Sequence, residues 1–196
     1  MSDRIEELRE ELRSKLSPKR YEHTLSVSYI CIALAMRYGY DMEKAELAGL
    51  LHDCAKRYSD EETISRCQRH GLELTEDELA APKVIHAKLG AYMAREKYGV
   101  TDREITDAIL YHTTGRCNMS LLDKIVYVAD YIEPRRFEAP ELGRLRQLAF
   151  LDLDEAMVLM MKGTLDYLKE KGGHVNSVTE AAYEYYKGFR EEIVNE

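Results

Sequence analysis

Apolar residues recur along most of the chain at the three- and four-residue spacing of an amphipathic helix. At the start of the chain, spacings of 3, 4 and 4 residues separate Ile5, Leu8, Leu12 and Leu16. Residues 125–129 come nearest to strand-like alternation, but the charged residues on either side of them keep a helical register. The pattern therefore predicts an all-α fold with about eight or more helices and no sheet.

Residues that favour helix ends mark the limits of these elements. Boxes in which Ser, Thr or Asp is followed three residues later by Glu predict helix starts at Ser59, Thr75, Thr101, Asp152 and Ser177. Ser17 followed by Pro18 predicts a further start. Glycine enters the left-handed conformation at low cost, which predicts helix ends at Gly39, Gly71, Gly99, Gly115 and Gly172.

We expect one main domain over residues 18–196, preceded by a separate amphipathic helix over residues 1–17. A length of 196 residues suits a single domain, and no Ser/Gly linker, low-complexity tract or repeat marks another boundary. The N-terminal helix could bury its stripe against this domain or against a second subunit. The sequence leaves both arrangements open.

Composition narrows the class of protein. A formal net charge of −8 disfavours general nucleic-acid binding. No apolar run approaches the ~20 residues of a membrane helix, and the charged start of the chain does not resemble a signal peptide. The 4 cysteines form no CxxC pair, which indicates reduced thiols. We expect a cytoplasmic protein that binds neither nucleic acid nor membrane.

Four of the 6 histidines lie on predicted helix faces that point inward: His23, His52, His86 and His112. A single histidine on an apolar face is more often a hydrogen-bonded core residue than a metal ligand. Four of them on four separate helices favour a shared metal site, because neutral imidazole is a common ligand of transition metals.

Two aspartates fall in similarly apolar surroundings. Asp53 directly follows His52, and Asp130 ends the run IVYVAD. Aspartate is rarely buried unless it is paired or bound to metal, so a hydrogen bond to the helix for Asp53 and a salt bridge for Asp130 are the alternatives. Together with the histidines they offer four nitrogens and two carboxylates, which exceed the needs of one tetrahedral zinc and suit two metals that share a bridge.

The order H…HD…H…H…D resembles the HD-domain superfamily of metal-dependent phosphohydrolases. Five strings carry a closer resemblance: RYEHTLSV at 20–27, GLLHDCAK at 49–56, VIHAKLGA at 84–91, ILYHTTGR at 109–116 and VYVADYIEPRR at 126–136. Together they are similar to the bacterial YqeK family of symmetrical diadenosine tetraphosphate hydrolases, which cleave the dinucleotide into two ADP. The resemblance runs from about residue 18 to the C-terminus and departs at residues 137–142, where the family has a Pro-Gly turn.

The resemblance implies an HD-domain helical bundle that holds two transition-metal ions. His23, His52, Asp53 and Asp130 would bind one metal, and His86 and His112 the second, with Asp53 as the bridge. Iron is the metal described for the family, and manganese or zinc would also suit these ligands. The resemblance also implies a homodimer.

The resemblance further implies the residues that act on the substrate. Catalytic roles are expected for Asp53, Lys56 and His86; Lys56 matches the family's HDxAK lysine. Contacts with the dinucleoside polyphosphate or its ADP product are expected from Lys83, His86, His112, Thr113, Asp130, Arg136, Gly172, Gly173, His174, Val175 and Asn176.

Two metals that share a carboxylate can lower the pKa of a water and polarise phosphoryl oxygens, so no side chain need act as the nucleophile. Another nucleotide phosphohydrolase, such as a nucleotidase, is the main alternative. A single-metal HD nucleotidase needs only H…HD…D, so the additional His86 and His112 argue against it. A diiron oxygenase would use the same six ligands on a smaller and less charged substrate. An inactive nucleotide sensor is the non-enzyme alternative, but no ligand is missing.

Overall fold

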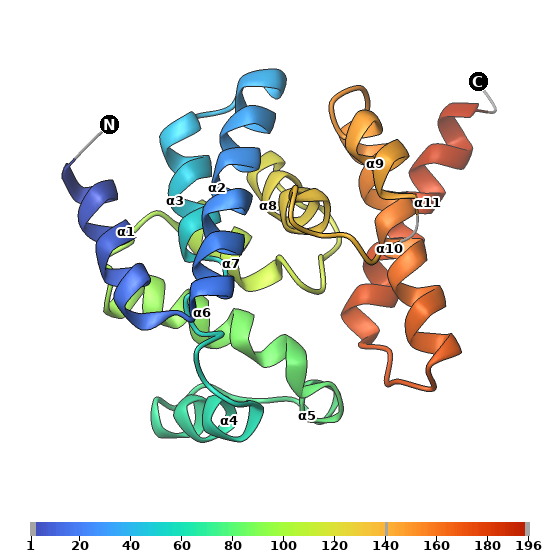
Figure 1. The fold of residues 1–196 in the computed structure, drawn as a ribbon. Helices are drawn as coiled ribbons and strands as arrows, with labels where there is room; N and C mark the ends of the chain where they lie inside the picture. Colours follow the sequence, from blue (N-terminus) through green and yellow to red (C-terminus); the bar gives the residue numbers. More distant parts are fainter. Residues whose placement is uncertain (1–2, 140, 195–196) are drawn as a thin grey trace.

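Helices form most of the protein in this computed structural model, which describes residues 3–139 and 141–194, with residues 189–194 described by backbone only. The described part has no strand, which confirms the predicted all-α class (Figure 1). Its elements are α1 (Asp3–Lys15), α2 (Pro18–Tyr38), α3 (Met42–Leu51), α4 (Asp60–Arg69), α5 (Glu76–Ala80), the 3-10 turn η1 (Pro82–Val84), α6 (Ile85–Glu96), α7 (Arg103–Tyr111), α8 (Leu121–Ile132), α9 (Leu142–Leu148), α10 (Leu153–Glu170) and α11 (Ser177–Val194).

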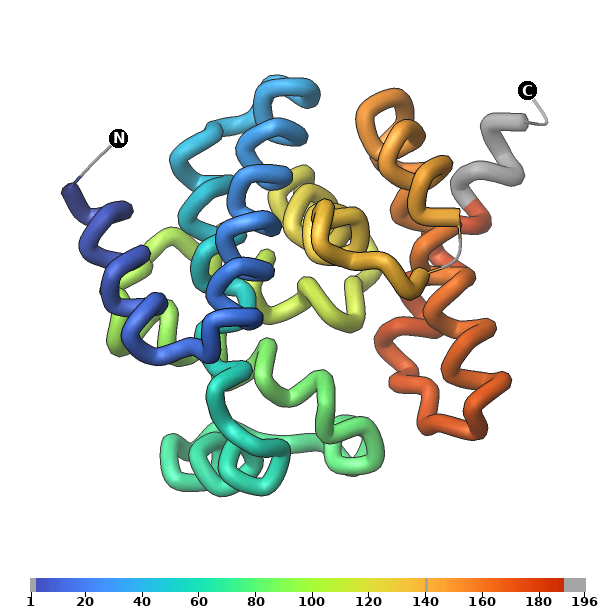
Figure 2. Tube along the Cα trace, viewed as in Figure 1, coloured from blue at the N-terminus to red at the C-terminus, as the bar shows by residue number. Residues whose placement is uncertain are grey.

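The helices α2, α3, α6, α7 and α8 form the centre of the molecule (Figure 1). The most extensive packing is between α2 and α3, where a Cβ atom at Gly49 would lie 2.8 Å from the Cα of Ser28. The α10–α11 pair covers the far side of α8, while α4 and α5 extend below α6. The tube in Figure 2 shows that α1 and α11 lie on opposite sides of the bundle.

The N-terminal helix packs against its own domain, which decides between the two arrangements that the sequence left open. Ile5, Leu8 and Leu12 are buried in the core cluster. Arg9 Nη2 lies 2.6 Å from Glu46 Oε1 on α3, and that glutamate is only 1% exposed. A buried pair of this kind fixes orientation more than it adds net stability.

Most predicted helix ends are confirmed. The Ser17, Ser59, Thr75 and Asp152 side chains each accept a hydrogen bond from a backbone N–H in the first turn. Two predicted starts are wrong by one residue. Asp102, rather than Thr101, caps α7, and Asn176 Oδ1 accepts the Val178 N–H ahead of Ser177. In both places the competing residue is an Asp or Asn, which caps at least as well as Ser or Thr.

The five glycines predicted to end helices all have positive φ values between 64° and 68°. No described helix is long and apolar enough to cross a membrane.

Candidate metal centre

Side chains from five helices converge at the centre of the bundle. His23 comes from the second turn of α2, Asp130 from the last turn of α8 and His86 from the first turn of α6. His52 and His112 are the C-cap residues of α3 and α7, and Asp53 follows His52. The exposed fractions of His52, Asp53, His86 and His112 are 0, 3, 6 and 3%. All six candidate ligands therefore meet in a mostly buried site.

Asp53 stands between two groups of histidines. Its Oδ1 lies 3.0 Å from Nε2 of His86 and 3.6 Å from Nε2 of His112. Its Oδ2 lies 3.5 Å from Nε2 of His52 and 3.6 Å from Nε2 of His23. Each carboxylate oxygen thus faces one pair of imidazoles, the arrangement of a carboxylate placed to bridge two ions.

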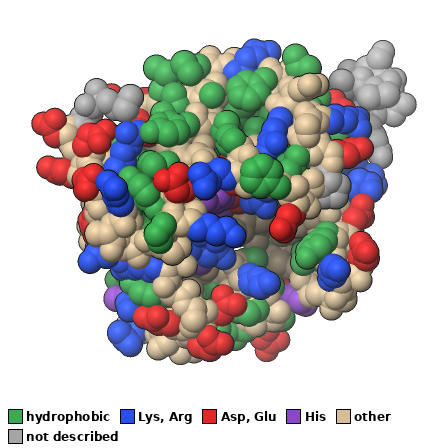
Figure 3. Space-filling model, in the orientation of Figure 1, with side chains coloured by type: hydrophobic (Ala, Val, Ile, Leu, Met, Phe, Trp, Pro, Cys, Tyr) green, Lys and Arg blue, Asp and Glu red, His purple; other side chains and the backbone are tan. Residues whose placement is uncertain are grey.

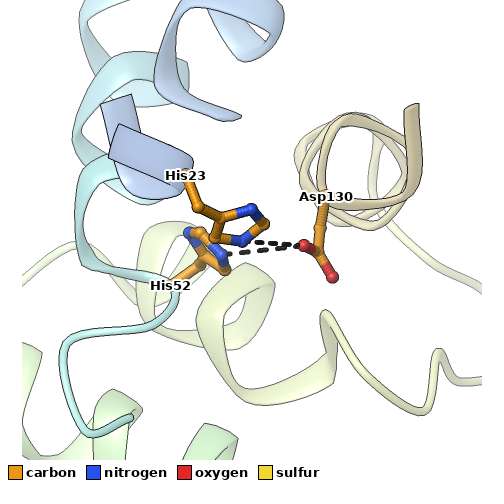
Figure 4. A group of neighbouring side chains, drawn as sticks. All are labelled: His23, His52 and Asp130. Carbon is orange, nitrogen blue, oxygen red and sulfur yellow. Dashed lines mark ion pairs between the residues drawn. The ribbon is translucent and has the colours of Figure 1, made fainter. Parts of the chain in front are cut away.

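Asp130 completes the group on the His23 side. Its Oδ1 lies 3.2 Å from Nε2 of His23 and 3.9 Å from Nε2 of His52. Figure 4 shows the two imidazoles pointing toward this carboxylate from α2 and the end of α3. The Asp130 side chain is 24% exposed, so this side of the site opens toward solvent.

The other ring nitrogen of each histidine has a fixed partner. Nδ1 of His52, His86 and His112 lies 2.7 Å from the carbonyl oxygen of Gly49, Lys83 and Ile109, respectively. Nδ1 of His23 lies 3.2 Å from Oε1 of Glu133, which is buried. Because a carbonyl can only accept, Nδ1 carries the proton in those three rings and Nε2 presents its lone pair to the centre.

The donor set fits transition-metal ions. Nε2 of His23 and Nε2 of His52 are buried and have no hydrogen-bond partner among the described residues. Buried polar atoms without partners are rare and call for an explanation such as an ion. Imidazole nitrogens mixed with carboxylate oxygens suit iron, manganese or zinc.

The surroundings of these side chains favour the protonation states in which they can bind metal. Burial would raise the pKa of Asp53, but the neighbouring His52, His112 and His86 hold it well below its usual range. Burial likewise opposes ionisation of Asp130, but the neighbouring His23, His52 and Arg136 outweigh it and hold that pKa below its usual range. Burial lowers the pKa of His86 to about 4. Near pH 7 both carboxylates are charged and His86 is neutral, as metal binding requires.

Three cations surround the carboxylates. Arg20 Nη1 lies 2.6 Å from Asp53 Oδ2. Arg136 Nη2 lies 3.0 Å from the carbonyl oxygen of Asp130 and 3.4 Å from its Oδ1. Lys56 is half-buried, and burial lowers the pKa of its amine. Figure 3 shows a hollow in this face with histidine inside it and Lys or Arg side chains on its rim.

Residues 20–135 match the family model described as HD domain. The chain belongs to the HD-domain family. It is 39% identical to the symmetrical bis(5'-nucleosyl)-tetraphosphatase of Bacillus subtilis over 176 residues, covering 89% of this chain and 92% of the relative. The protein of the same name from Halalkalibacterium halodurans is 38% identical over 172 residues, covering 88% and 91%. The chain is therefore a member of the same family as these tetraphosphatases.

A solved structure extends the similarity to three dimensions. The crystal structure of a predicted HD superfamily hydrolase involved in NAD metabolism from Clostridium acetobutylicum is 38% identical to this chain and superposes with a TM-score of 0.89. It covers 93% of this chain, and this chain covers 96% of it. The predicted HD-domain bundle is thus confirmed.

The other predicted substrate residues of this HD domain fall into two sets. Near the histidines, Lys83 has an exposed side chain, and its carbonyl oxygen lies 3.5 Å from Lys56 Nζ. Thr113 Oγ1 is buried without a hydrogen-bond partner among the described residues. Farther along, Gly172 and Gly173 end α10 through hydrogen bonds to the carbonyls of Lys169 and Leu168.

The rest of that loop is tied to α5. His174 Nε2 lies 2.5 Å from Asp77 Oδ1, and the Ser177 N–H donates to Asp77 Oδ2 at 2.8 Å. Val175 is half-buried and Asn176 is buried. The structure therefore places residues 172–176 at the edge of the molecule, between α10, α11 and α5.

Sequence reasoning missed three residues of this arrangement: Arg20, Glu133 and Asp77. Arg20 precedes His23 by one helical turn and Glu133 follows Asp130 by three residues, so helical spacing alone could have pointed to both. Asp77 had no local signal, because its partner His174 lies 97 residues away.

Proposed function

We propose that the chain hydrolyses diadenosine tetraphosphate, or a closely related dinucleoside tetraphosphate, symmetrically into two nucleoside diphosphates. The observation that carries this proposal is Asp53 between two pairs of imidazoles, in a fold that is 38–39% identical to two symmetrical tetraphosphatases over most of its length. Both the structural and the sequence likeness cover the whole candidate site.

The proposed ligands form two groups that share Asp53. His23, His52 and Asp130 would hold one transition-metal ion with Asp53 Oδ2, and His86 and His112 would hold a second with Oδ1. Iron is the proposed metal, with manganese or zinc as alternatives that suit the same atoms. When bound, such ions supply an acidified water as nucleophile and positive charge against the phosphoryl oxygens.

The side chains around this centre bind and orient the tetraphosphate. Arg20 and Arg136 lie against the two central carboxylates, where a guanidinium can bind phosphate oxygens through two parallel hydrogen bonds. Lys56 and the side chain of Lys83 add positive charge on the side of His86, and the Lys56 ammonium can donate a proton to the leaving phosphate. These local cations offset the net charge of −8, which would otherwise repel the substrate.

One nucleoside would lie along the 172–176 loop, with Thr113 and His112 beside its phosphates. Asp77 stabilises this loop by accepting hydrogen bonds from His174 and Ser177. Preorganisation of the loop reduces the entropy lost when the nucleoside binds.

Hydrolysis in oxygen-18 water tests the proposal. Metal-loaded protein is expected to convert diadenosine tetraphosphate into ADP alone, with the label in only one of the two ADP molecules from each turnover. AMP and ATP among the products would contradict symmetrical cleavage. Mononucleotides serve as the comparison, because a nucleotidase would cleave them in preference.

We also propose that the protein acts in the cytoplasm as a homodimer and binds neither nucleic acid nor membrane. The outer face of α2 supports the dimer, since Tyr29 and Met36 there are 52% and 63% exposed and lie two turns apart. Sedimentation of the purified chain at micromolar concentration tests it, and a monomer would contradict it.

A further inference from the structure

An apolar pocket lies beside the metal centre, between α2, the C-terminal end of α8 and the turn after α9. Its volume is about 260 Å³, and it is lined by Ile30, Ile132, Pro134, Arg146 and Phe150. None of these residues belongs to the candidate site described above. The pocket is large enough for a ring system and too small for a whole dinucleotide.

The pocket lies close to the metal ligands along two parts of the chain, helix α2 and the segment at the end of α8. Ile30 follows His23 by seven residues on α2, so both side chains lie on the same helix face about 10.5 Å apart along the axis. Ile132 and Pro134 flank Glu133, whose carboxylate holds Nδ1 of His23. Arg136 connects the two places, because its Nη2 contacts Asp130 and its carbonyl oxygen accepts a hydrogen bond from Arg146, which lines the pocket.

Hydrogen bonds hold the walls in place. Arg146 donates to the carbonyl oxygens of Ile132, Glu133 and Arg136 at 2.9, 2.9 and 2.8 Å. On the other wall, Arg37 Nε donates to the Phe150 carbonyl at 2.6 Å. The pocket is thus formed before any ligand arrives.

The chemistry of the walls suits a flat aromatic ring. Arg146 uses the edge of its guanidinium on three carbonyls, which leaves the planar face for stacking. Pro134, Phe150 and the two isoleucines supply apolar contact. Phe137 directly follows Arg136 and is 81% exposed, the highest value among the large apolar side chains that are exposed in the described part.

We infer that this pocket binds the second nucleoside of the dinucleoside tetraphosphate, with Phe137 covering its base. The first nucleoside lies on the other side of the metal centre, along residues 172–176, and Arg136 binds the phosphates between the centre and the pocket. The inference rests on the proposed function and extends it, because it makes the distal nucleoside a determinant of specificity.

The test compares two substrates with the same four phosphates. Diadenosine tetraphosphate carries two nucleosides, and adenosine 5'-tetraphosphate carries one. The wild-type protein is expected to prefer the dinucleotide by about tenfold or more in kcat/KM, the usual effect of stacking one base. Ile30→Trp fills the pocket and is expected to remove that preference, with less than about a twofold change for adenosine 5'-tetraphosphate.

Two further variants act without filling the pocket. Phe137→Ala removes an exposed ring, and Phe150→Leu keeps an apolar wall but loses its ring; each is expected to lower the preference severalfold through KM. Leu151→Ala is the matched control, because Leu151 is 73% exposed beside Phe150 and does not line the pocket. The control is expected to keep the wild-type preference.

The outcomes separate the two proposals. Protein that cleaves neither tetraphosphate contradicts the proposed function and removes the ligand assigned to the pocket. Wild-type protein that cleaves both compounds equally well, or a preference unchanged in Phe137→Ala and Phe150→Leu, overturns the pocket assignment alone.

Discussion

At the scale of single residues, Asp53 is the proposed bridge between the two groups of metal ligands. It is the residue whose two oxygens each face a separate pair of histidines. Asp53→Ala is expected to lose both metal ions, because it removes a ligand from each. Elemental analysis of the purified variant measures the loss, and circular dichroism controls for unfolding. A variant that retains one ion at full occupancy would contradict a bridging role.

Substitution of Glu133 tests whether the proposed ligand His23 needs a hydrogen-bond partner at its Nδ1. Its carboxylate holds Nδ1 of His23 from outside the ring of ligands. Glu133→Gln is expected to weaken metal affinity by about 10- to 100-fold, since partners of this kind orient the imidazole and raise its basicity. Titration with metal against a competing chelator measures the change.

Glu22→Gln is the matched control, because Glu22 pairs with Arg135 at the surface and lies next to His23 in sequence only. Equal metal affinity in Glu133→Gln and the wild-type protein would show that His23 needs no such partner.

At the scale of elements, the contact between α2 and α3 sets the distance between His23 and the His52–Asp53 pair. Gly49 allows this contact, since a Cβ atom there would meet Ser28 Cα at 2.8 Å and Cys31 Sγ at 3.0 Å. Gly49→Ala is expected to push the helices apart, to lower the free energy of unfolding by about 1–3 kcal/mol and to reduce metal content.

Gly143→Ala supplies the comparison for that variant. A Cβ atom at Gly143 would meet nothing within 4 Å, so its melting temperature and metal content are expected to match the wild type. If Gly49→Ala behaves in the same way, the close approach of α2 and α3 does not control the site.

Elements also show what could be predicted from the sequence. Helix starts and stops depend on a few neighbouring residues, so the sequence predicts the caps Ser59, Thr75 and Gly39 correctly. The inward histidines were predictable because a helix repeats its faces every three to four residues. The contact between Asp77 and His174 and the pocket between α2, α8 and α9 could not be predicted, because each depends on how segments distant in sequence pack together.

At the scale of the whole molecule, the metal centre joins elements from α2 to α8 that span residues 23–130. An ion that binds only the folded chain adds about 2.7 kcal/mol to the free energy of unfolding when its concentration is 100 times Kd. Removal of metal by a chelator is therefore expected to lower the melting temperature by several degrees. Thermal melts with and without chelator measure this shift, which should be reversed by added metal. No shift would contradict metal binding at the junction of these helices.

The hydrogen bonds of His52, His86 and His112 have a consequence for how the site is specified. Each ring is held by the carbonyl oxygen three residues earlier in its own segment, at Gly49, Lys83 and Ile109. Main-chain atoms cannot be lost by substitution, so no change of side chain elsewhere can remove these partners. The orientation of three of the four imidazoles is therefore fixed within their own short segments of the chain. Evolution could therefore remodel the surrounding surface and substrate pockets freely while the inner ring of nitrogens stays correctly aimed.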